Sequence, residues 1–333
     1  MSENTFKAIV VHKSDAGQFT RHIEERPCED LPSGEVLIQV QFSSLNYKDA
    51  LSATGHPGVT RNFPHTPGID AAGLVEESSS ADFAAGDPVL VTGYDLGMGT
   101  PGGYGRYIRV PAAWVLPLPV GFSLQESMIY GTAGFTSAQC INELEAGGIT
   151  PERGEILVTG ATGGVGSLAV GMLARAGYQV VAASGKMDAE QYLIDLGAGT
   201  VLSRDEIIDD SGKPLLSGRW AGVVDAVGGT ILATAIKSAR DRAVVTCCGL
   251  VAAAELPTTV YPFILRGIRL VGINSVDVPM PLRRHLWSRM ATEWKLENLE
   301  HLSRTCALEG LEVEIERILQ GRQKGRVIVD LAR

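Results

Sequence analysis

Residues 156–167 combine an apolar run with a glycine-rich turn, a pattern that can bind phosphate. They read Ile-Leu-Val-Thr-Gly-Ala-Thr-Gly-Gly-Val-Gly-Ser, which predicts a strand, a tight turn and the start of a helix. Such a turn holds a dinucleotide pyrophosphate, because glycines admit the phosphates and the helix N-terminus offers unpaired N–H groups. Ala161 replaces the first glycine of the usual fingerprint. A turn that only permits close helix–strand packing is the alternative. The expected contacts are Thr162, Gly163, Gly164 and Val165.

The end of the next predicted strand selects between the two nicotinamide dinucleotides. An NAD site usually has Asp or Glu there, accepting hydrogen bonds from the ribose. This chain has Ser184-Gly185-Lys186 and no acid, and Arg204 follows the strand after it. Positive charge and a hydroxyl suit a 2′-phosphate, so the sequence predicts NADPH. The alternative is that Lys186 and Arg204 are ordinary surface charges.

The elements that must position these residues form two groups. Short Val/Ile-rich runs bounded by Gly, Pro or Asp predict strands and a partly open barrel; they cover 6–11, 35–43, 73–76, 88–92 and 105–110. From about residue 123 strands alternate with helices, which predicts a parallel, doubly wound sheet. Its strands are expected at 156–159, 179–184, near Val201, and at 222–226, 243–248 and 268–273, with helices at 163–176 and 189–196.

The chain is therefore expected to be an α/β protein of two domains. Residues 127–278 form the cofactor domain, and residues 1–126 form the barrel domain, completed by 279–333. In that last segment the pattern predicts helices at 282–294 and 309–319 and a strand at 326–331.

Composition excludes several classes of function. The 333 residues are 45% hydrophobic, which is enough for two cores. A net charge of −9 with no basic block argues against nucleic acid. The five cysteines form no CxxC pair, so neither a disulfide framework nor a zinc knuckle is indicated. Neither a signal peptide nor an apolar run of about 18 residues is present, so we expect a cytoplasmic protein without a membrane partner.

Four further segments resemble one family. They are Ser43-Ser-Leu-Asn-Tyr-Lys-Asp-Ala, Pro67-Gly-Ile-Asp-Ala-Ala-Gly, Gly131-Thr-Ala-Gly-Phe-Thr and Pro262-Phe-Ile-Leu-Arg-Gly. Together they resemble the zinc-free branch of the medium-chain dehydrogenase/reductase superfamily, in the YhdH/YhfP group named for quinone oxidoreductases, which includes acrylyl-CoA reductases. The resemblance implies a GroES-like β-barrel catalytic domain, a Rossmann cofactor domain and a homodimer.

The same segments predict that the site holds no metal. Zinc-dependent members have Cys-His near Asn46-Tyr47 and Gly-His-Glu where this chain has Gly68-Ile69-Asp70. Asn and Ile cannot replace a thiolate and an imidazole as zinc ligands.

Without zinc, reduction of an activated C=C bond is favoured over alcohol oxidation. Conjugation already makes the β carbon electrophilic, so hydride from nicotinamide C4 can add there. The developing enolate then needs hydrogen-bond donors, and the α carbon needs a proton.

Five residues are candidates for this chemistry. Tyr47 donates a hydrogen bond or the proton, or it only shapes the nicotinamide pocket. Asn46 bonds a carbonyl or caps the following turn. Asp49 pairs with Arg61, orients the neighbouring lysine or only starts a helix. Asp70 sits in the cleft or holds the domain together by hydrogen bonds. Arg61 meets a carboxylate or a phosphate, or is a solvated loop residue.

The resemblance also implies cofactor contacts outside the glycine turn. They are Tyr47, Thr136, Leu250, Ile264, Ser275 and Gln320. Core packing is the alternative for Leu250 and Ile264, because both follow predicted strands.

The sequence thus predicts a zinc-independent NADPH-dependent reductase of activated C=C bonds. By resemblance, the sharpest substrate is acrylyl-CoA or a similar enoyl thioester. An NADPH quinone oxidoreductase is the alternative enzyme, since a quinone is also a conjugated acceptor. A non-catalytic NADPH-binding sensor is the alternative from another class.

Overall fold

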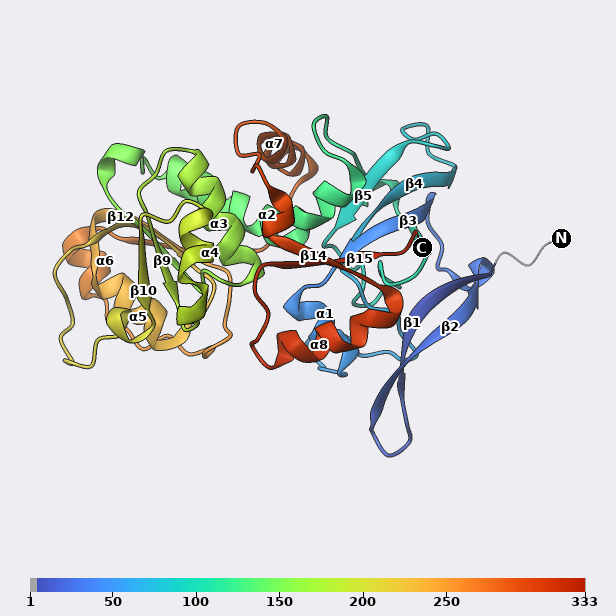
Figure 1. Ribbon diagram of the computed structural model, residues 1–333, viewed down its shortest axis with the longest axis horizontal. Coiled ribbons are helices and arrows are strands. Elements are labelled where there is room, and N and C mark those ends of the chain that lie inside the picture. The colour runs from blue at the N-terminus through green and yellow to red at the C-terminus, as the bar shows by residue number, and fades with distance from the viewer. Residues whose placement is uncertain (1–4, 333) are drawn as a thin grey trace. The chain divides into compact units, whose positions relative to one another are not determined.

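The computed structural model describes residues 5–332, apart from the side chain of Met187. These residues form two compact units (Figure 1). Unit 1 contains the chain up to Thr132, Val276–Ser288 and the chain from Asn298, and unit 2 contains Ala133–Ser275 and Arg289–Glu297.

This division differs from the predicted one in three places, one of which is that Val276–Val278 belong to unit 1. The first boundary lies a few residues beyond 126/127, and Arg289–Glu297 belongs to unit 2. Contacts within unit 2 explain the placement of Arg289–Glu297: Arg289 donates to Glu145 at 2.6 Å and lies over the Trp294 ring.

Unit 2 is built on a six-stranded parallel sheet in the order β10-β9-β8-β11-β12-β13. The strands are β8 (Ile156–Thr159), β9 (Val180–Ser184), β10 (Thr200–Ser203), β11 (Trp220–Asp225), β12 (Ala239–Cys247) and β13 (Arg269–Gly272). The helices are α2 (Leu124–Ala146, which begins in unit 1), α3 (Gly164–Arg175), α4 (Glu190–Asp195), α5 (Gly229–Lys237) and α6 (Tyr261–Arg266). The strand order reverses between β8 and β11, and a ligand crevice is expected at the carboxyl ends of those strands. The predicted doubly wound sheet is confirmed.

The apolar strands of unit 2 form because both faces of the sheet are covered. Every residue of β8, β9 and β11 is buried, which requires continuous apolar runs in place of alternation. α5 contributes Ile231, Leu232 and Ile236 to the core cluster that covers one face.

Unit 1 is built on a seven-stranded sheet in the order β14-β15-β3-β4-β5-β7, with β6 paired to β3, and a β1–β2 hairpin. The strands are β1 (Thr5–Lys13), β2 (Phe19–Pro27), β3 (Val36–Ser44), β4 (Asp70–Ser78), β5 (Pro88–Thr92), β6 (Tyr107–Val110), β7 (Leu116–Pro117), β14 (Ser303–Ala307) and β15 (Arg326–Asp330). The helices are α1 (Tyr47–Ala53), α7 (Met280–Ala291, which ends in unit 2) and α8 (Leu311–Leu319).

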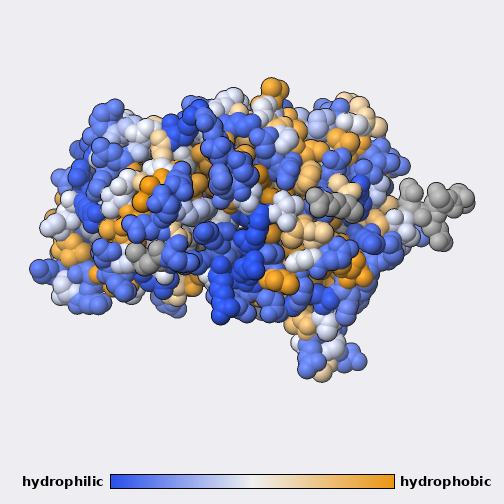
Figure 2. Space-filling model, viewed as in Figure 1, coloured by the Kyte–Doolittle hydropathy of each residue, from blue (hydrophilic) through white to orange (hydrophobic). Residues whose placement is uncertain are grey.

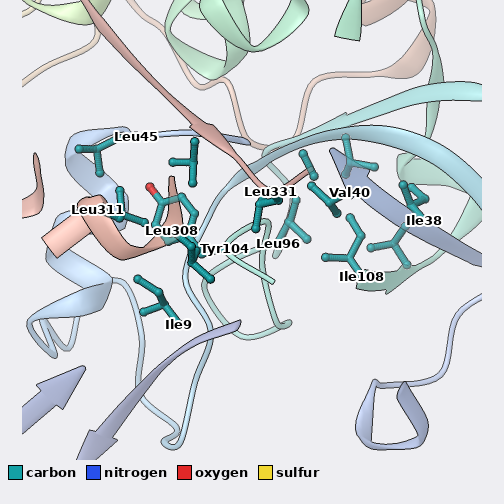
Figure 3. Packing of buried hydrophobic residues seen from close by; sticks show 14 of the residues in the cluster. Ile9, Ile38, Val40, Leu45, Leu96, Tyr104, Ile108, Leu308, Leu311 and Leu331 are labelled. Carbon is teal, nitrogen blue, oxygen red and sulfur yellow. The ribbon is translucent and has the colours of Figure 1, made fainter. Parts of the chain in front are cut away.

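The core of unit 1 joins residues from distant parts of the chain. Ile9, Ile38 and Ile108 from the first part pack with Leu308, Leu311 and Leu331 near the end (Figure 3). The C-terminal segment therefore completes the barrel core, through the pairing of β15 with β3 and the packing of α8 beside α1 (Figure 1).

Three strands of unit 1 were not predicted: β2, β14 and the two-residue β7. β2 and β14 contain several charged or polar residues, and neither has a fully buried residue, so their sequences lack an apolar pattern. The remaining predicted strands and helices are confirmed with shifted ends, such as Met280–Ala291 for the helix expected at 282–294.

Figure 2 shows hydrophilic and hydrophobic residues interspersed over the face that it draws. No helix in the described part of the chain is both long and apolar enough to cross a membrane.

Candidate functional site

The glycine turn of unit 2 has the geometry of a phosphate cradle. Gly160, directly after β8, has φ +60° and makes the tight turn one residue before Ala161, which explains why alanine is tolerated in the fingerprint. A Cβ on Gly166 would lie 2.3 Å from the Gly160 carbonyl oxygen, so only glycine allows α3 to start this close to the strand. The Gly163 N–H closes this turn by donating to the Gly160 carbonyl at 2.9 Å. The N–H groups of Gly164 and Val165 lie in the first turn of α3, where no intrahelical acceptor is present, and they are the groups that can bind a phosphate.

The ends of β9 and β10 bring the predicted 2′-phosphate residues together. Ser203 pairs with Ser184 in the parallel register, so Arg204 lies beside Gly185. A Cβ on Gly185 would be 2.6 Å from Arg204 Nη2. The Ser184 hydroxyl accepts a hydrogen bond from the Lys186 backbone N–H at 3.0 Å and lies 3.3 Å from the Thr162 hydroxyl. A hydroxyl, a guanidinium and a lysine thus gather where an NAD site would place an acid.

A buried pair at the strand-order reversal was not predicted. Thr159, at the end of β8, donates to the Asp225 carboxylate at 2.6 Å, and Asp225 accepts the Gly228 N–H at 2.8 Å. Burial raises the pKa of Asp225, and these hydrogen bonds oppose the rise. The pair fixes the loop after β11 beside the cradle. A polar residue ending an apolar strand was the available sequence signal.

Unit 1 contains a buried polar cluster centred on Asp70, the first residue of β4. Its carboxylate accepts hydrogen bonds from Ser44 Oγ at 2.6 Å and from the Asn46 amide at 2.8 Å. It also accepts the Thr132 hydroxyl at 2.6 Å and the Thr132 N–H at 2.9 Å. Asp70 thereby caps the second part of α2, which starts after a non-helical residue, Gly131.

The backbone conformation at Gly131 explains why the segment Gly131-Thr-Ala-Gly-Phe-Thr begins with glycine. Its φ is +49°, and a Cβ there would lie 2.5 Å from Asp70 Oδ2. A larger residue would displace the carboxylate that caps the helix.

Arg326, the first residue of β15, is the counter-ion of this cluster. It is 1% exposed. Its guanidinium lies 4.0 Å from Asp70 and donates to Ser44 Oγ, to Asn46 Oδ1 and to the carbonyls of Leu45 and Ile129. Burial lowers its pKa, and the neighbouring carboxylates oppose that change.

Asp49 lies in the same cluster and is fully buried. Its carboxylate accepts the backbone N–H groups of Asn46 and Ile69, each at 2.8 Å. Burial, and then the charge of Asp70, raises the pKa of Asp49 to about 7. Two buried carboxylates facing one guanidinium carry no net charge when Asp49 is protonated.

The predicted catalytic residues therefore occupy different environments. Asn46, Asp49 and Asp70 come together, while Tyr47 is 42% exposed and Arg61 is exposed. Arg61 donates to the Pro57 carbonyl, so the expected pairing of Asp49 with Arg61 is wrong. Asn46 uses both ends of its amide, towards Asp70 and Arg326, and it is the N-cap of α1.

The cofactor contacts expected by resemblance are distributed over both units. Thr136 is buried on α2, whereas Leu250 and Ile264 are 67% and 73% exposed, so their alternative interpretation as core residues is wrong. Ser275 follows β13, and Gln320 is the C-cap of α8 in unit 1. Burial raises the pKa of the Cys247 thiol, which favours its neutral form.

Within residues 5–332 no group of three or more His, Cys, Asp or Glu side chains is arranged to hold a metal ion. The prediction of a metal-free site rests on Asn46 and Ile69 in the zinc-ligand positions.

The sequence did not predict several residues that hold the site together, namely Arg326, Ser44, Thr132 and Asp225. Arg326 had a signal, since it is a charged residue at the start of a fully buried strand. Its partners lie some 280 positions earlier in the chain, as the contact with Asn46 shows, and no local pattern connects them.

Comparisons with known proteins agree with this architecture. A family model described as "Alcohol dehydrogenase GroES-like domain" matches residues 32–120, and one described as "Zinc-binding dehydrogenase" matches residues 164–292. The chain is 45% identical over 327 residues to YhfP of Bacillus subtilis, provisionally named a quinone oxidoreductase, and this match covers 98% of the chain and 99% of YhfP. It is 43% identical to the acrylyl-CoA reductase AcuI of Ruegeria pomeroyi over 98% of the chain and 99% of that protein.

Solved structures give the same result. The yhdH oxidoreductase of Salmonella enterica in complex with NADP superimposes with a TM-score of 0.94 at 40% identity, over 97% of this chain and 99% of that one. YhfP with NAD bound has a TM-score of 0.95 at 44% identity, over 98% and 99% of the two chains. The chain therefore belongs to the medium-chain dehydrogenase/reductase superfamily, in its YhdH/AcuI-type family.

Proposed function

We propose that this protein is an NADPH-dependent reductase of activated C=C bonds. The main support for NADPH as the coenzyme is that Ser184, Lys186 and Arg204 lie beside the glycine cradle, with no acid at the end of β9. The cradle fits a dinucleotide, because Gly160 and Gly166 allow α3 to begin close to the end of β8, and the N-terminus of that helix offers N–H groups to a phosphate. Salmonella yhdH with NADP supports NADPH, whereas YhfP with NAD makes a direct comparison of the two coenzymes necessary.

NADPH, when bound, supplies the hydride. The Gly164 and Val165 N–H groups would hold its pyrophosphate, and Lys186 and Arg204 would neutralise the 2′-phosphate. Thr159 and Asp225 fix the neighbouring loop.

The candidate residues of unit 1 are of two kinds: a residue that contacts the reacting substrate, and buried residues that hold the site in place. Tyr47, exposed at the start of α1, is proposed to donate a hydrogen bond or a proton to the reduced substrate. Asn46, Asp49 and Asp70 have all their hydrogen bonds directed into the buried cluster, so we reassign them from catalytic to positioning residues. Arg61 is a candidate contact for an anionic group of the substrate, because its guanidinium is exposed.

The proposed substrate is acrylyl-CoA or a similar short enoyl thioester. The name of the Ruegeria relative supports this choice, and the name of YhfP supports a quinone as the second candidate. Both acceptors accept hydride at an electron-poor carbon, so one site could serve either chemistry.

Oxidation of NADPH by the purified protein tests these alternatives. Saturable turnover with acrylyl-CoA, and slow, unsaturable turnover with quinones, is expected. The reverse pattern would assign a quinone reductase. No turnover with any enone, enoyl thioester or quinone, despite NADPH binding, would assign a sensor.

We also propose a homodimer formed through β13, the edge strand of the unit 2 sheet. Its outer edge has no partner strand within the described part of the chain, and unpaired edges are commonly covered.

A further inference from the structure

Unit 2 contains a cavity of about 530 Å³. It lies at the end of the parallel sheet opposite to the cofactor cradle. It is lined by Arg153, Gly218, Ala221, Arg240, Asp241 and Arg266. Ala221 and Arg240 are the second residues of β11 and β12, so the cavity lies at the amino ends of these strands. The glycine turn follows the carboxyl end of β8 in the same parallel sheet. The turn and the cavity therefore lie at opposite ends of the strands. The two sites are therefore distinct.

The lining carries an excess of positive charge. Three guanidinium groups and one carboxylate, Asp241, surround the cavity. Within residues 5–332, none of these three arginines has a carboxylate within 4.0 Å of its nitrogens. The neighbouring Arg219, by contrast, pairs with Glu155 at 3.4 Å. In a chain of net charge −9, three unpaired arginines around one cavity are a local reversal of the overall charge.

The backbone holds these guanidinium groups in place. Arg240 Nη1 donates to the Arg153 carbonyl at 3.1 Å, and Arg153 Nη2 donates to the Asp241 carbonyl at 3.2 Å. Arg266 donates to the carbonyls of Lys237 and Ala239 at 3.0 and 2.7 Å. Each bond uses part of a five-donor fork, so Arg153 and Arg240 are oriented while most of their N–H groups stay available to a ligand.

We propose that this cavity binds a small anion that carries two or more phosphate groups. Guanidinium forks bind phosphate oxygens bidentately, and like charges held together are stabilised by a multivalent counter-ion. The cavity is open to solvent on one side, and its volume exceeds the needs of a single inorganic ion. Inorganic pyrophosphate and the triphosphate of a nucleotide share the required chemistry.

Calorimetric titration of the full chain with pyrophosphate and with ATP tests the proposal. The protein is first saturated with NADPH, which fills the cradle. Both ligands are expected to bind at one site per chain. Binding of ATP but not pyrophosphate would show that the nucleoside contributes to affinity. Binding of pyrophosphate but not ATP would show that the phosphates suffice. Either result supports the proposal.

The variants R153Q and R240Q should each weaken this binding about tenfold, with the affinity for NADPH unchanged. Arg242→Gln, an exposed arginine on the same strand that does not line the cavity, is the matched control. No binding of either anion, or equal losses in R242Q, would overturn the site. Because NADPH affinity is measured separately, failure of the proposed cofactor is distinguished from failure of the cavity. Arg266 is left intact, since its carbonyl contacts stabilise the fold.

Discussion

Tyr47 and Asn46 are neighbours in the chain and have opposite surroundings. The Tyr47 side chain is 42% exposed, whereas Asn46 is 9% exposed with its amide engaged at both ends. Tyr47 is also the first residue of α1, anchored by Asn46 as N-cap. The exposed phenol is therefore the group in this loop that can reach a ligand without breaking buried hydrogen bonds.

Tyr47→Phe separates a chemical role from a shaping one. If the phenol donates a proton or a hydrogen bond, kcat for the enoyl thioester should fall about 10²-fold or more, with KM for NADPH unchanged. Phenylalanine keeps the ring, so an unaltered kcat would show that Tyr47 only shapes its pocket. Steady-state kinetics measure both parameters.

Lys186→Ala tests the basis of coenzyme choice. Loss of a charge-assisted bond to the 2′-phosphate should weaken NADPH binding about tenfold and leave NADH binding nearly unchanged, because NADH has no phosphate there. Lys213→Ala, an exposed lysine elsewhere in unit 2, is the control. Equal losses for NADPH and NADH by calorimetry would contradict the assignment.

Asp49 predicts a pH dependence of stability. Its pKa rises from an ordinary value of 3.8 to about 7 in the folded protein, so the folded state binds a proton that the unfolded state releases between these values. The free energy of unfolding should therefore fall as pH rises from about 4 to about 7, by up to ~4 kcal/mol, and level off above.

Urea unfolding of Asp49→Asn across this pH range is the measurement. The variant is less stable overall, since Asn46 N–H loses its carboxylate acceptor, but its slope against pH should be smaller than that of the unmutated protein. Asp82→Asn, an exposed carboxylate, should keep the original slope. An unchanged slope in Asp49→Asn would assign the proton to another group.

β15 shows how one strand can organise the elements around it. Arg326 at its start contacts the end of β3, the cap of α1 and the carbonyl of Ile129 before the break in α2. Its guanidinium also offsets the buried Asp70 carboxylate at 4.0 Å. Three elements distant in sequence are thus held by one side chain.

Arg326→Met should destabilise the protein by about 3–5 kcal/mol, because it leaves buried carboxylates without their counter-ion. Arg322→Met, an exposed arginine shortly before β15, is the matched control and should change stability little. Chemical denaturation measures both. Equal effects of the two substitutions would show that the Arg326 network contributes no more than surface packing.

The elements also show what the sequence could and could not predict. β8, β9 and β11 were predictable because each is an apolar run closed by a polar or small residue and buried on both faces. β2 and β14 were not, because they are stabilised by pairing to a neighbouring strand and carry charged side chains. The Ser184–Lys186–Arg204 group follows from strand order, whereas the Arg326 cluster depends on contacts across nearly the whole chain.

At the scale of the whole molecule, unit 2 has exposed apolar side chains at α6. Val260, Tyr261 and Leu265 at α6 are 64%, 51% and 62% exposed. β13, which directly follows α6, forms the edge of the parallel sheet. An unpaired strand edge beside exposed apolar side chains favours association with another chain.

We therefore expect a homodimer whose interface includes α6 and β13. Leu265→Glu should shift the protein to a monomer in light scattering, because it would place a carboxylate in a desolvated interface. Val313→Glu, on α8 of unit 1 and 60% exposed, is matched in chemistry and exposure and should leave the dimer intact. A monomer for the unmutated chain, or equal dissociation of both variants, would contradict this interface. Because the cavity lined by Arg153 and Arg240 is tested by anion binding and the interface by mass, the two proposals succeed or fail separately.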